Sequence, residues 1–360
     1  MPTFFPTSQT VNIASVPAGS WTTVDISSIV PSNTTAVMYS THNSVGYTEA
    51  IWARGTGDST NYITGLHDGQ GAHDYTNGCG VAQVYNGTSI DVYTDAGGGS
   101  AYLSIWGYFT SSELQLPNTL GSSILPYSSG LTAATWTTID LSSFIAANFS
   151  NVGAAYGVVM MPWVGPTDGG GYGCGGQGIR PVGSGINQAA YSTVGDQGGT
   201  TGVATTFTPG QGYKIQMYVG TAISAGYFNV IGLLTQDCLR IATQDIPYTV
   251  GASGAYTQVS LESTLDTTCP TIAGGLSTAW IISTTSGGAC GLNQTVSGGS
   301  IFPSAAPQAG FHYSGGQVLA APLNSGGTMY QYAGNGATTY YIGGKWIVPS
   351  AGQLFFGTNF

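Results

Sequence analysis

The sequence has few charged residues. Asp, Glu, Lys and Arg make up 6% of its 360 residues, where about a quarter is usual. Only five residues are basic, and the formal net charge is −10. A chain without a basic patch cannot neutralise phosphates or bind an anionic membrane surface, so we expect neither nucleic acid nor a membrane among its partners. A weakly charged surface also protects an isolated monomer poorly against association, which favours a surface covered by neighbouring proteins.

Segments that direct proteins into or across membranes are also missing. No run reaches the about 18 apolar residues that indicate a spanning helix. The start, Met1–Pro6, carries no basic residue and no long apolar stretch follows it, so we expect no signal peptide and synthesis in the cytoplasm. The five cysteines fall at unrelated places, which predicts mostly free thiols, with Cys269–Cys290 the pair most open to bridging.

Glycine, aromatic and β-branched residues are abundant. The chain has 57 Gly, 22 Tyr, 12 Phe and 7 Trp, and 42% of its residues are hydrophobic. Such aromatic content supplies too much buriable surface for a disordered chain. No long segment shows the 3.6-residue apolar period of a helix. The composition therefore predicts an all-β protein made of short strands and turns.

Three landmarks recur in the same order along the chain. The opening Trp21–Ser28 returns as Trp136–Ser143 and, in weaker form, as Tyr256–Ser263. The closing segments are Tyr102–Gly107, Tyr227–Gly232 and Tyr340–Lys345, and a third motif recurs as Gly87–Tyr93, Gly212–Tyr218 and Gly327–Tyr332. A spacing of 115 to 120 residues matches a whole domain rather than a solenoid repeat. We predict three tandem β-sandwich, jelly-roll-like domains at 1–112, 113–237 and 238–360, the last divergent.

Within each unit, six to eight short strands are expected. Because Trp21–Ile26 alternates apolar with polar residues, we predict a half-buried strand with Trp21, and likewise Trp136 and Tyr256, facing the core. The Asn86–Gly87 turn between 81–85 and 89–93 predicts a β-hairpin.

Two arginines occupy equivalent places just before a turn. Arg54–Gly57 and Arg180–Gly183 share an Arg-x-x-Gly pattern. One interpretation is a contact with another protein. The other is a bond within the domain, from the guanidinium to turn carbonyls or to Asp25 and Asp140. Either interpretation makes both arginines architectural.

Other motifs carry less chemistry. The His67–Asp74 segment could bind a divalent metal, but a polar turn explains it as well. The glycine-rich Gly169–Gly178 lacks the Lys and Ser/Thr of a phosphate loop. Glutamate occurs only three times and no nucleophile elbow is present. We therefore expect a protein that is not an enzyme and needs no metal or other cofactor.

The repeated opening, the Arg-x-x-Gly pattern and a closing strand that ends at glycine resemble the small β-sandwich domains of tailed-phage virion proteins. Two copies fit well, and the third departs at the Asp, the Arg and the final Gly. The resemblance implies a non-enzymatic virion protein of the capsid-decoration, cement, head-fibre or tail-fibre type.

We expect a protein that decorates or cements a phage capsid, with a pseudo-trimer as one arrangement at a local threefold position. Its partners would be the major capsid protein, other virion proteins and copies of itself. One alternative is a receptor- or glycan-binding tail-fibre module that uses Tyr and Trp to stack host-surface sugars. Another is the subunit of an extracellular filament or sheath. For anchoring to the particle, the sequence favours the Met1–Pro6 arm with Phe4 and Phe5, and Gln353–Gly357 at the other end.

Overall fold

The structure is a computed structural model. It describes residues 2–43, 51–59, 77–85, 87–94, 101–119, 124–126, 131–164, 177–187, 191–192, 203–219, 226–250, 255–260, 275–284, 290–293, 317–322, 328–333 and 338–350. These residues form antiparallel sheets and one short helix, which confirms the all-β prediction.

The first lobe consists of two sheets that enclose a core. The inner sheet has the order β1-β7-β3-β5, and the outer sheet the order β2-β6-β4. The strands are β1 (Thr3–Val11), β2 (Thr22–Asp25), β3 (Thr34–Asn43), β4 (Ile51–Gly55), β5 (Asn77–Gln83), β6 (Ser89–Thr94) and β7 (Ala101–Thr110).

The second lobe repeats this arrangement. Its inner sheet has the order β14-β11-β16-β8, with β9 also paired to β16, and its outer sheet the order β10-β15-β12-β13. The elements are β8 (Leu114–Gln115), β9 (Ile124–Pro126), β10 (Thr137–Asp140), α1 (Ser142–Asn148), β11 (Gly157–Val164), β12 (Gln177–Pro181), β13 (Tyr191–Ser192), β14 (Val203–Thr206), β15 (Lys214–Val219) and β16 (Gly226–Leu234).

The third lobe has an inner sheet in the order β17-β23-β19-β21 and an outer sheet in the order β18-β22-β20. Its strands are β17 (Leu239–Val250), β18 (Ala255–Ser260), β19 (Gly275–Thr284), β20 (Cys290–Asn293), β21 (Gln317–Pro322), β22 (Thr328–Ala333) and β23 (Thr338–Ser350).

Strand order identifies the fold of the lobes. When β8 and β9 count as one split strand, the second lobe pairs its first, eighth, third and sixth strands in one sheet and its second, seventh, fourth and fifth in the other. Such alternation between two facing sheets is a jelly roll. The first and third lobes show the same order among their described strands. This agreement supports the predicted repeat, whose common origin and boundaries stay a prediction.

The predicted hairpin at Asn86–Gly87 is wrong. β5 pairs with β3 in the inner sheet, whereas β6 pairs with β2 and β4 in the outer sheet. Gly87 adopts a φ of 76°, and a Cβ there would lie 2.3 Å from the Ser32 carbonyl oxygen. The turn therefore crosses from the inner sheet to the outer sheet, because each flanking strand pairs with strands that lie far away in the sequence.

The inner sheets of the first and second lobes are buried on both faces. In β3, Val37 and Tyr39 enter the core of the first lobe, while Ala36 and Met38 belong to a separate apolar cluster. In β11, Val158 and Met160 face the second lobe's core, and Val159 and Met161 join that same separate cluster. We call this shared set the central cluster. It includes Ala36, Met38, Phe109, Leu114, Val159, Met161, Ala204, Ile231, Leu234, Cys238, Leu239 and Trp346.

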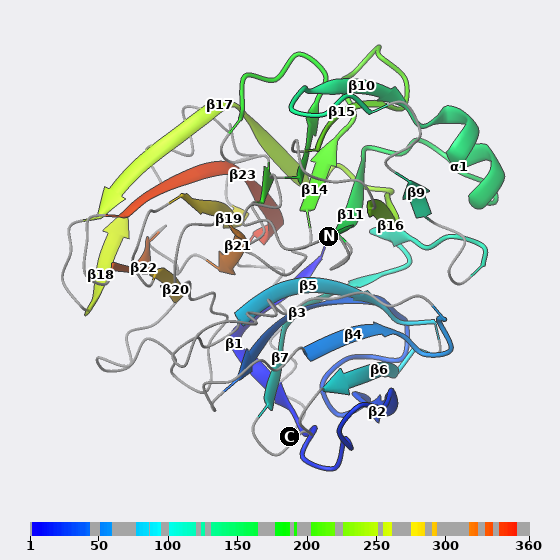
Figure 1. Cartoon of the computed structure of the whole chain (residues 1–360), viewed down its shortest axis with the longest axis vertical. Helices are drawn as coiled ribbons and strands as arrows, with labels where there is room; N and C mark the ends of the chain where they lie inside the picture. Colours follow the sequence, from blue (N-terminus) through cyan, green and yellow to red (C-terminus); the bar gives the residue numbers. More distant parts are fainter. Residues whose placement is uncertain are drawn as a thin grey trace.

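The central cluster draws equivalent positions from the three lobes. A β-bulge interrupts the register at one corresponding place in each inner sheet, just before a glycine, at Gly107, Gly232 and Gly344. Two residues beyond each glycine stand Phe109, Leu234 and Trp346, all in the central cluster. On the first strand of each inner sheet, Phe4 pairs with Gly107 and Ile241 pairs with Gly344, while Leu116 follows Gln115, the partner of Leu233. All three side chains pack against the central cluster. The three lobes therefore meet at the central cluster, and Figure 1 shows their strands as three groups around the middle of the molecule.

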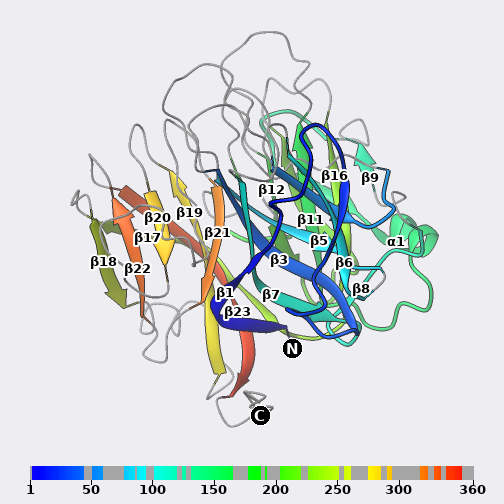
Figure 2. The same ribbon diagram turned by 90° about the horizontal axis from the view of Figure 1, so that it is seen from below.

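Polar contacts also join the lobes. Gln83, 1% exposed on β5, donates a hydrogen bond from Nε2 to the carbonyl oxygen of Ile231 at 2.8 Å. Ile231 is the bulged residue of β16. Figure 2 shows the strands of the third lobe, in olive-green to red, grouped beside β1 and β7 of the first.

Candidate functional site: an arginine and aromatic cluster on the outer sheets

Trp21 lies on the outer face of the first lobe, so its predicted core-facing position is wrong. It directly precedes β2 and is half-buried. Because side chains alternate along a strand, Trp21 shares a face with Thr23 and Asp25, whereas Val24 packs against the core. The opening motif does alternate between apolar and polar residues, but Trp21 lies on the strand face that carries the polar residues.

Arg54 covers the Trp21 ring. The guanidinium carbon lies 3.8 Å from the ring centroid, within the range of a cation–π interaction. Arg54 Nε lies 3.8 Å from Oδ2 of Asp91, and both side chains are 11% exposed. The same carboxylate accepts hydrogen bonds from Thr23 Oγ1 at 2.8 Å and from the Gly57 backbone at 3.3 Å. Arg54 thus ties the beginning of β2 to β4 and β6.

A row of three aromatic rings crosses the same outer sheet. Trp52 stacks on Tyr93 with ring centroids 4.5 Å apart, and Trp21 lies tilted against both at 5.9 and 5.6 Å. Trp52 and Tyr93 are directly opposite in the β4–β6 register. Cross-strand aromatic pairs stabilise a sheet, and these rings cover a face that no helix in the described part of the chain packs against.

The second lobe contains an equivalent pair of arginine and tryptophan, with different neighbouring residues. Arg180 lies 4.2 Å from the Trp136 ring centroid, and Trp136 lies 5.3 Å from Tyr218. Gln216 takes the place of Asp91, and its Oε1 accepts a hydrogen bond from Arg180 Nε at 2.8 Å. Gly178 stands where the first lobe has a tryptophan. Trp136 is half-buried on the outer face, so its predicted core position is wrong for the same reason.

Arg180 also reaches the joint with the third lobe. Its Nη1 donates hydrogen bonds to the carbonyl oxygen of Ile186 and to Oδ1 of Asn187, both at 2.6 Å. The Asn187 backbone in turn donates to both carboxylate oxygens of Asp245 on β17, at 3.1 Å. Burial lowers the pKa of Arg180 although Asp245 opposes the shift. Arg180 therefore orders the loop that contacts the next lobe.

The arginine contacts lie within the chain, as one of the two interpretations proposed, but the expected carboxylates are not the partners. Asp25 accepts hydrogen bonds from the backbone and hydroxyl of Ser27 at 2.8 and 3.0 Å. Asp140 accepts one from the Ser142 backbone at 2.9 Å. These bonds to the following serines lower the pKa of both aspartates. The Asp-x-Ser element of the repeat therefore closes the turn after the strand.

In the third lobe, Tyr256 lies on β18 opposite Tyr332 on β22, where the other lobes have Trp21 with Tyr93 and Trp136 with Tyr218. Its side chain lies outside what the structure describes, so its core position stays a prediction. Asn293, opposite Tyr330, stands on β20 where the other lobes have arginine.

The N-terminal arm is part of the fold of the first lobe. Thr3–Val11 forms β1, paired with β7. Phe4 packs on Trp346 of the third lobe with centroids 6.4 Å apart, and Phe5 on Tyr108 at 5.8 Å. Phe4 therefore joins the first lobe to the third, whereas Phe5 packs within the first lobe, and the use of both against a neighbouring protein stays a prediction. Gln353–Gly357 lies outside the described residues.

Sequence reasoning missed the central cluster. Its signal was present, because Ala36–Tyr39 and Val158–Met161 are unbroken apolar runs, typical of strands buried on both faces. Cys238 is buried there, and burial raises the pKa of its thiol to about 12. It is a free thiol, as expected.

No metal-binding group of three or more His, Cys, Asp or Glu occurs among the described residues. His67–Asp74, Cys269 and residues 169–176 of the glycine-rich segment lie outside them. Within the same part of the chain, no helix is long and apolar enough to cross a membrane.

Comparison with known proteins adds little. No family model matches the chain, and no curated protein matches it. One solved structure, described as the crystal structure of the T13 IBDV viral particle, is similar at 10% identity over 94% of this chain and 72% of that chain, with a TM-score of 0.15. Identity and TM-score this low do not establish a shared fold, so the function proposed below rests on the chain's own residues.

Proposed function

We propose that the chain is a non-enzymatic structural protein of a virus particle, which decorates or cements a phage capsid as a covalent pseudo-trimer. The central cluster is the observation that carries this proposal. Met38 and Val159 occupy one equivalent position, and Phe109, Leu234 and Trp346 another, so the lobes present matching faces to one another. A body with approximate threefold symmetry fits a threefold position in a closed shell.

Composition supports the same role. With 6% charged residues, the chain suits a surface that neighbouring subunits cover. The arginines Arg54 and Arg180 form contacts within the chain, so they serve the architecture of the lobes. Jelly rolls are widespread among capsid domains, although lectins and cupins share the fold.

Copy number in native particles tests this proposal. We expect quantitative mass spectrometry of purified particles to give a fixed integer ratio between this chain and the shell subunit. Cryo-electron microscopy of the same particles should show density for three lobes at local threefold positions. A few copies confined to the tail would support the receptor-binding alternative and contradict a capsid role. Absence from the particle would contradict both.

A further inference from the structure

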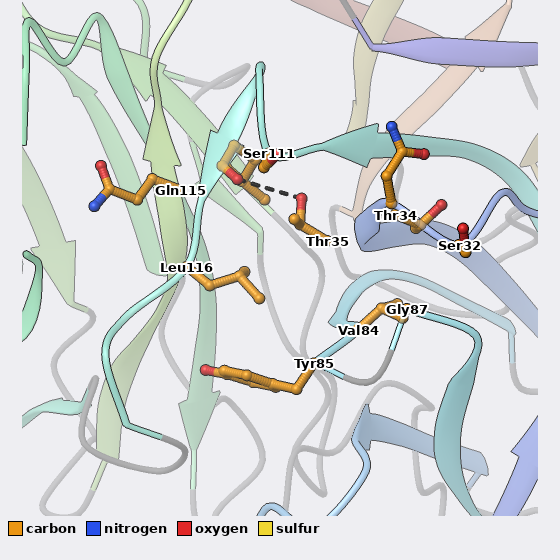
Figure 3. Close-up of a pocket in the computed structure, with 11 residues that line it drawn as sticks. Ser32, Thr34, Thr35, Val84, Tyr85, Gly87, Ser111, Gln115 and Leu116 are labelled. Carbon is orange, nitrogen blue, oxygen red and sulfur yellow. Dashed lines mark hydrogen bonds between the residues drawn. The ribbon is translucent and has the colours of Figure 1, made fainter.

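A pocket of about 330 Å³ lies between the first lobe and the connection to the second. It is formed by the Ser32–Thr35 segment, the β5–β6 turn and the stretch that joins β7 to β8. Thr35 fixes this stretch, since its hydroxyl lies 3.3 Å from the Phe109 carbonyl oxygen and 3.2 Å from that of Leu114. The dashed line in Figure 3 marks the bond to Leu114. The pocket therefore spans two units of the chain.

The lining is amphipathic and uncharged. The polar residues Ser32, Asn33, Ser111 and Gln115 line it together with Val84, Tyr85, Leu114 and Leu116. The Gln115 carboxamide points away from the pocket in Figure 3 and donates a hydrogen bond to the Ser150 carbonyl oxygen at 2.6 Å. In Figure 3, Tyr85 and Leu116 lie across the pocket from Ser32, Thr34 and Gly87. No residue of the lining is ionised at neutral pH, so the pocket offers nothing to neutralise a charged ligand.

Two hydroxyl groups in the walls have no partner among the described residues. Thr34 is 2% exposed, and its Oγ1 makes no hydrogen bond; nor does the buried hydroxyl of Tyr85. Burial, together with the negative charge of Asp58, raises the pKa of Tyr85, which keeps the phenol a protonated donor. A buried hydroxyl without a partner costs free energy, and a ligand oxygen reached by a small side-chain rotation would remove that cost.

We propose that this pocket binds one sugar residue of a neutral saccharide. A pyranose ring combines apolar C–H faces with a rim of hydroxyl groups that both donate and accept hydrogen bonds. The wall of Tyr85 and Leu116 matches the faces, and the side chains of Asn33 and Ser111 match the rim. The volume lies at the lower end of the range for small-molecule sites, which suits a single ring.

Saturation-transfer NMR on the full chain tests the site with methyl glycosides of glucose, galactose, mannose and N-acetylglucosamine, and with glucuronic acid as the anionic comparison. We expect at least one neutral glycoside to bind with a Kd in the low millimolar range, roughly 1–10 mM, and glucuronic acid to bind more weakly. Ser111→Phe should block the pocket and weaken binding at least about tenfold. Ser111 and Ser28 are both exposed, so Ser28→Phe outside the pocket is the matched control and should bind normally.

Failure of every neutral glycoside to bind would overturn the proposal, and so would equal binding by the Ser111→Phe variant. A photo-crosslinker at position 33 that captures a shell protein in native particles, with no sugar bound in solution, would assign the pocket to a protein partner instead. None of these results alters the copy-number test, because the pocket lies within one chain.

Discussion

The ring of Trp346 in the third lobe meets the ring of Phe109 in the first edge-on, with centroids 5.4 Å apart. The two residues occupy equivalent positions, each two places beyond the glycine that follows a bulge. Their contact therefore joins equivalent positions of the first and third lobes. Edge-to-face geometry is favourable for aromatic pairs beyond the area they bury.

Replacement of Trp346 should separate the effects of the central cluster from those of the outer sheets. Trp346 is 2% exposed, so Trp346→Ala should lower the free energy of unfolding by about 3–5 kcal/mol. Trp21→Ala should cost less, because Trp21 is half-buried on an outer face. Chemical denaturation of both variants measures the difference. Equal losses would contradict the assignment of Trp346 to a core between lobes.

The glycines after the bulges should not tolerate a side chain. A Cβ on Gly107 would lie 2.7 Å from the Thr3 carbonyl oxygen, on Gly232 2.7 Å from that of Gln115, and on Gly344 2.4 Å from that of Arg240. Each Gly→Ala change should cost about 1–3 kcal/mol, because backbone must move.

Gly153→Ala is the control for these variants. A Cβ there would meet nothing within 4 Å, so thermal unfolding should stay near that of the original chain. A neutral result at all three bulge glycines, measured in the same way, would show that the inner sheets lack the described register.

A double-mutant cycle tests the pairing of Arg54 with Trp21. Removal of each side chain, singly and together, should reveal a coupling of about 0.5–1 kcal/mol. The Arg180–Trp136 pair should couple similarly, but Arg180→Ala alone should cost more than Arg54→Ala, because Arg180 also orders the loop at Ile186. Additive losses in both lobes would rule out a stabilising contact between ring and guanidinium.

Acid should weaken the turns that follow the second strand of the first two lobes. Hydrogen bonds to Ser27 and Ser142 lower the pKa of Asp25 and Asp140 in the folded chain. A lowered folded pKa means that the stabilisation is present above the ordinary carboxyl pKa, about 4, and is lost as pH falls through the folded value. Asp25→Asn and Asp140→Asn should therefore flatten the fall of the melting temperature below about pH 4. An unchanged acid profile would assign the acid sensitivity to other carboxyls.

The strands could largely be predicted from the sequence, whereas their pairing could not. Segments such as Lys214–Val219 alternate cleanly and form strands as expected. The hairpin prediction at Asn86–Gly87 failed because a local turn signal says nothing about competing partners: β5 pairs with β3, and β6 pairs with β2 and β4.

The candidate site was predicted in part. Trp21 and Arg54 were singled out as recurring residues, and the structure brings them together. Their orientation was misjudged, because bulky aromatics were assigned to the core without counting the two-residue period from Val24. Contacts between lobes, such as Gln83 with Ile231, join residues 148 positions apart and leave no local trace in the sequence.

Because the three lobes are covalently linked, they stay associated even when the protein is diluted. Three separate subunits would fall apart at low concentration, whereas lobes on one chain keep a high effective concentration for one another at any dilution. In a trimer of identical subunits, a substitution appears in all three subunits at once, whereas in this chain a substitution changes one lobe alone. The outer sheets of the lobes differ at equivalent places, with Trp52 in the first lobe, Gly178 in the second and Asn293 in place of arginine in the third.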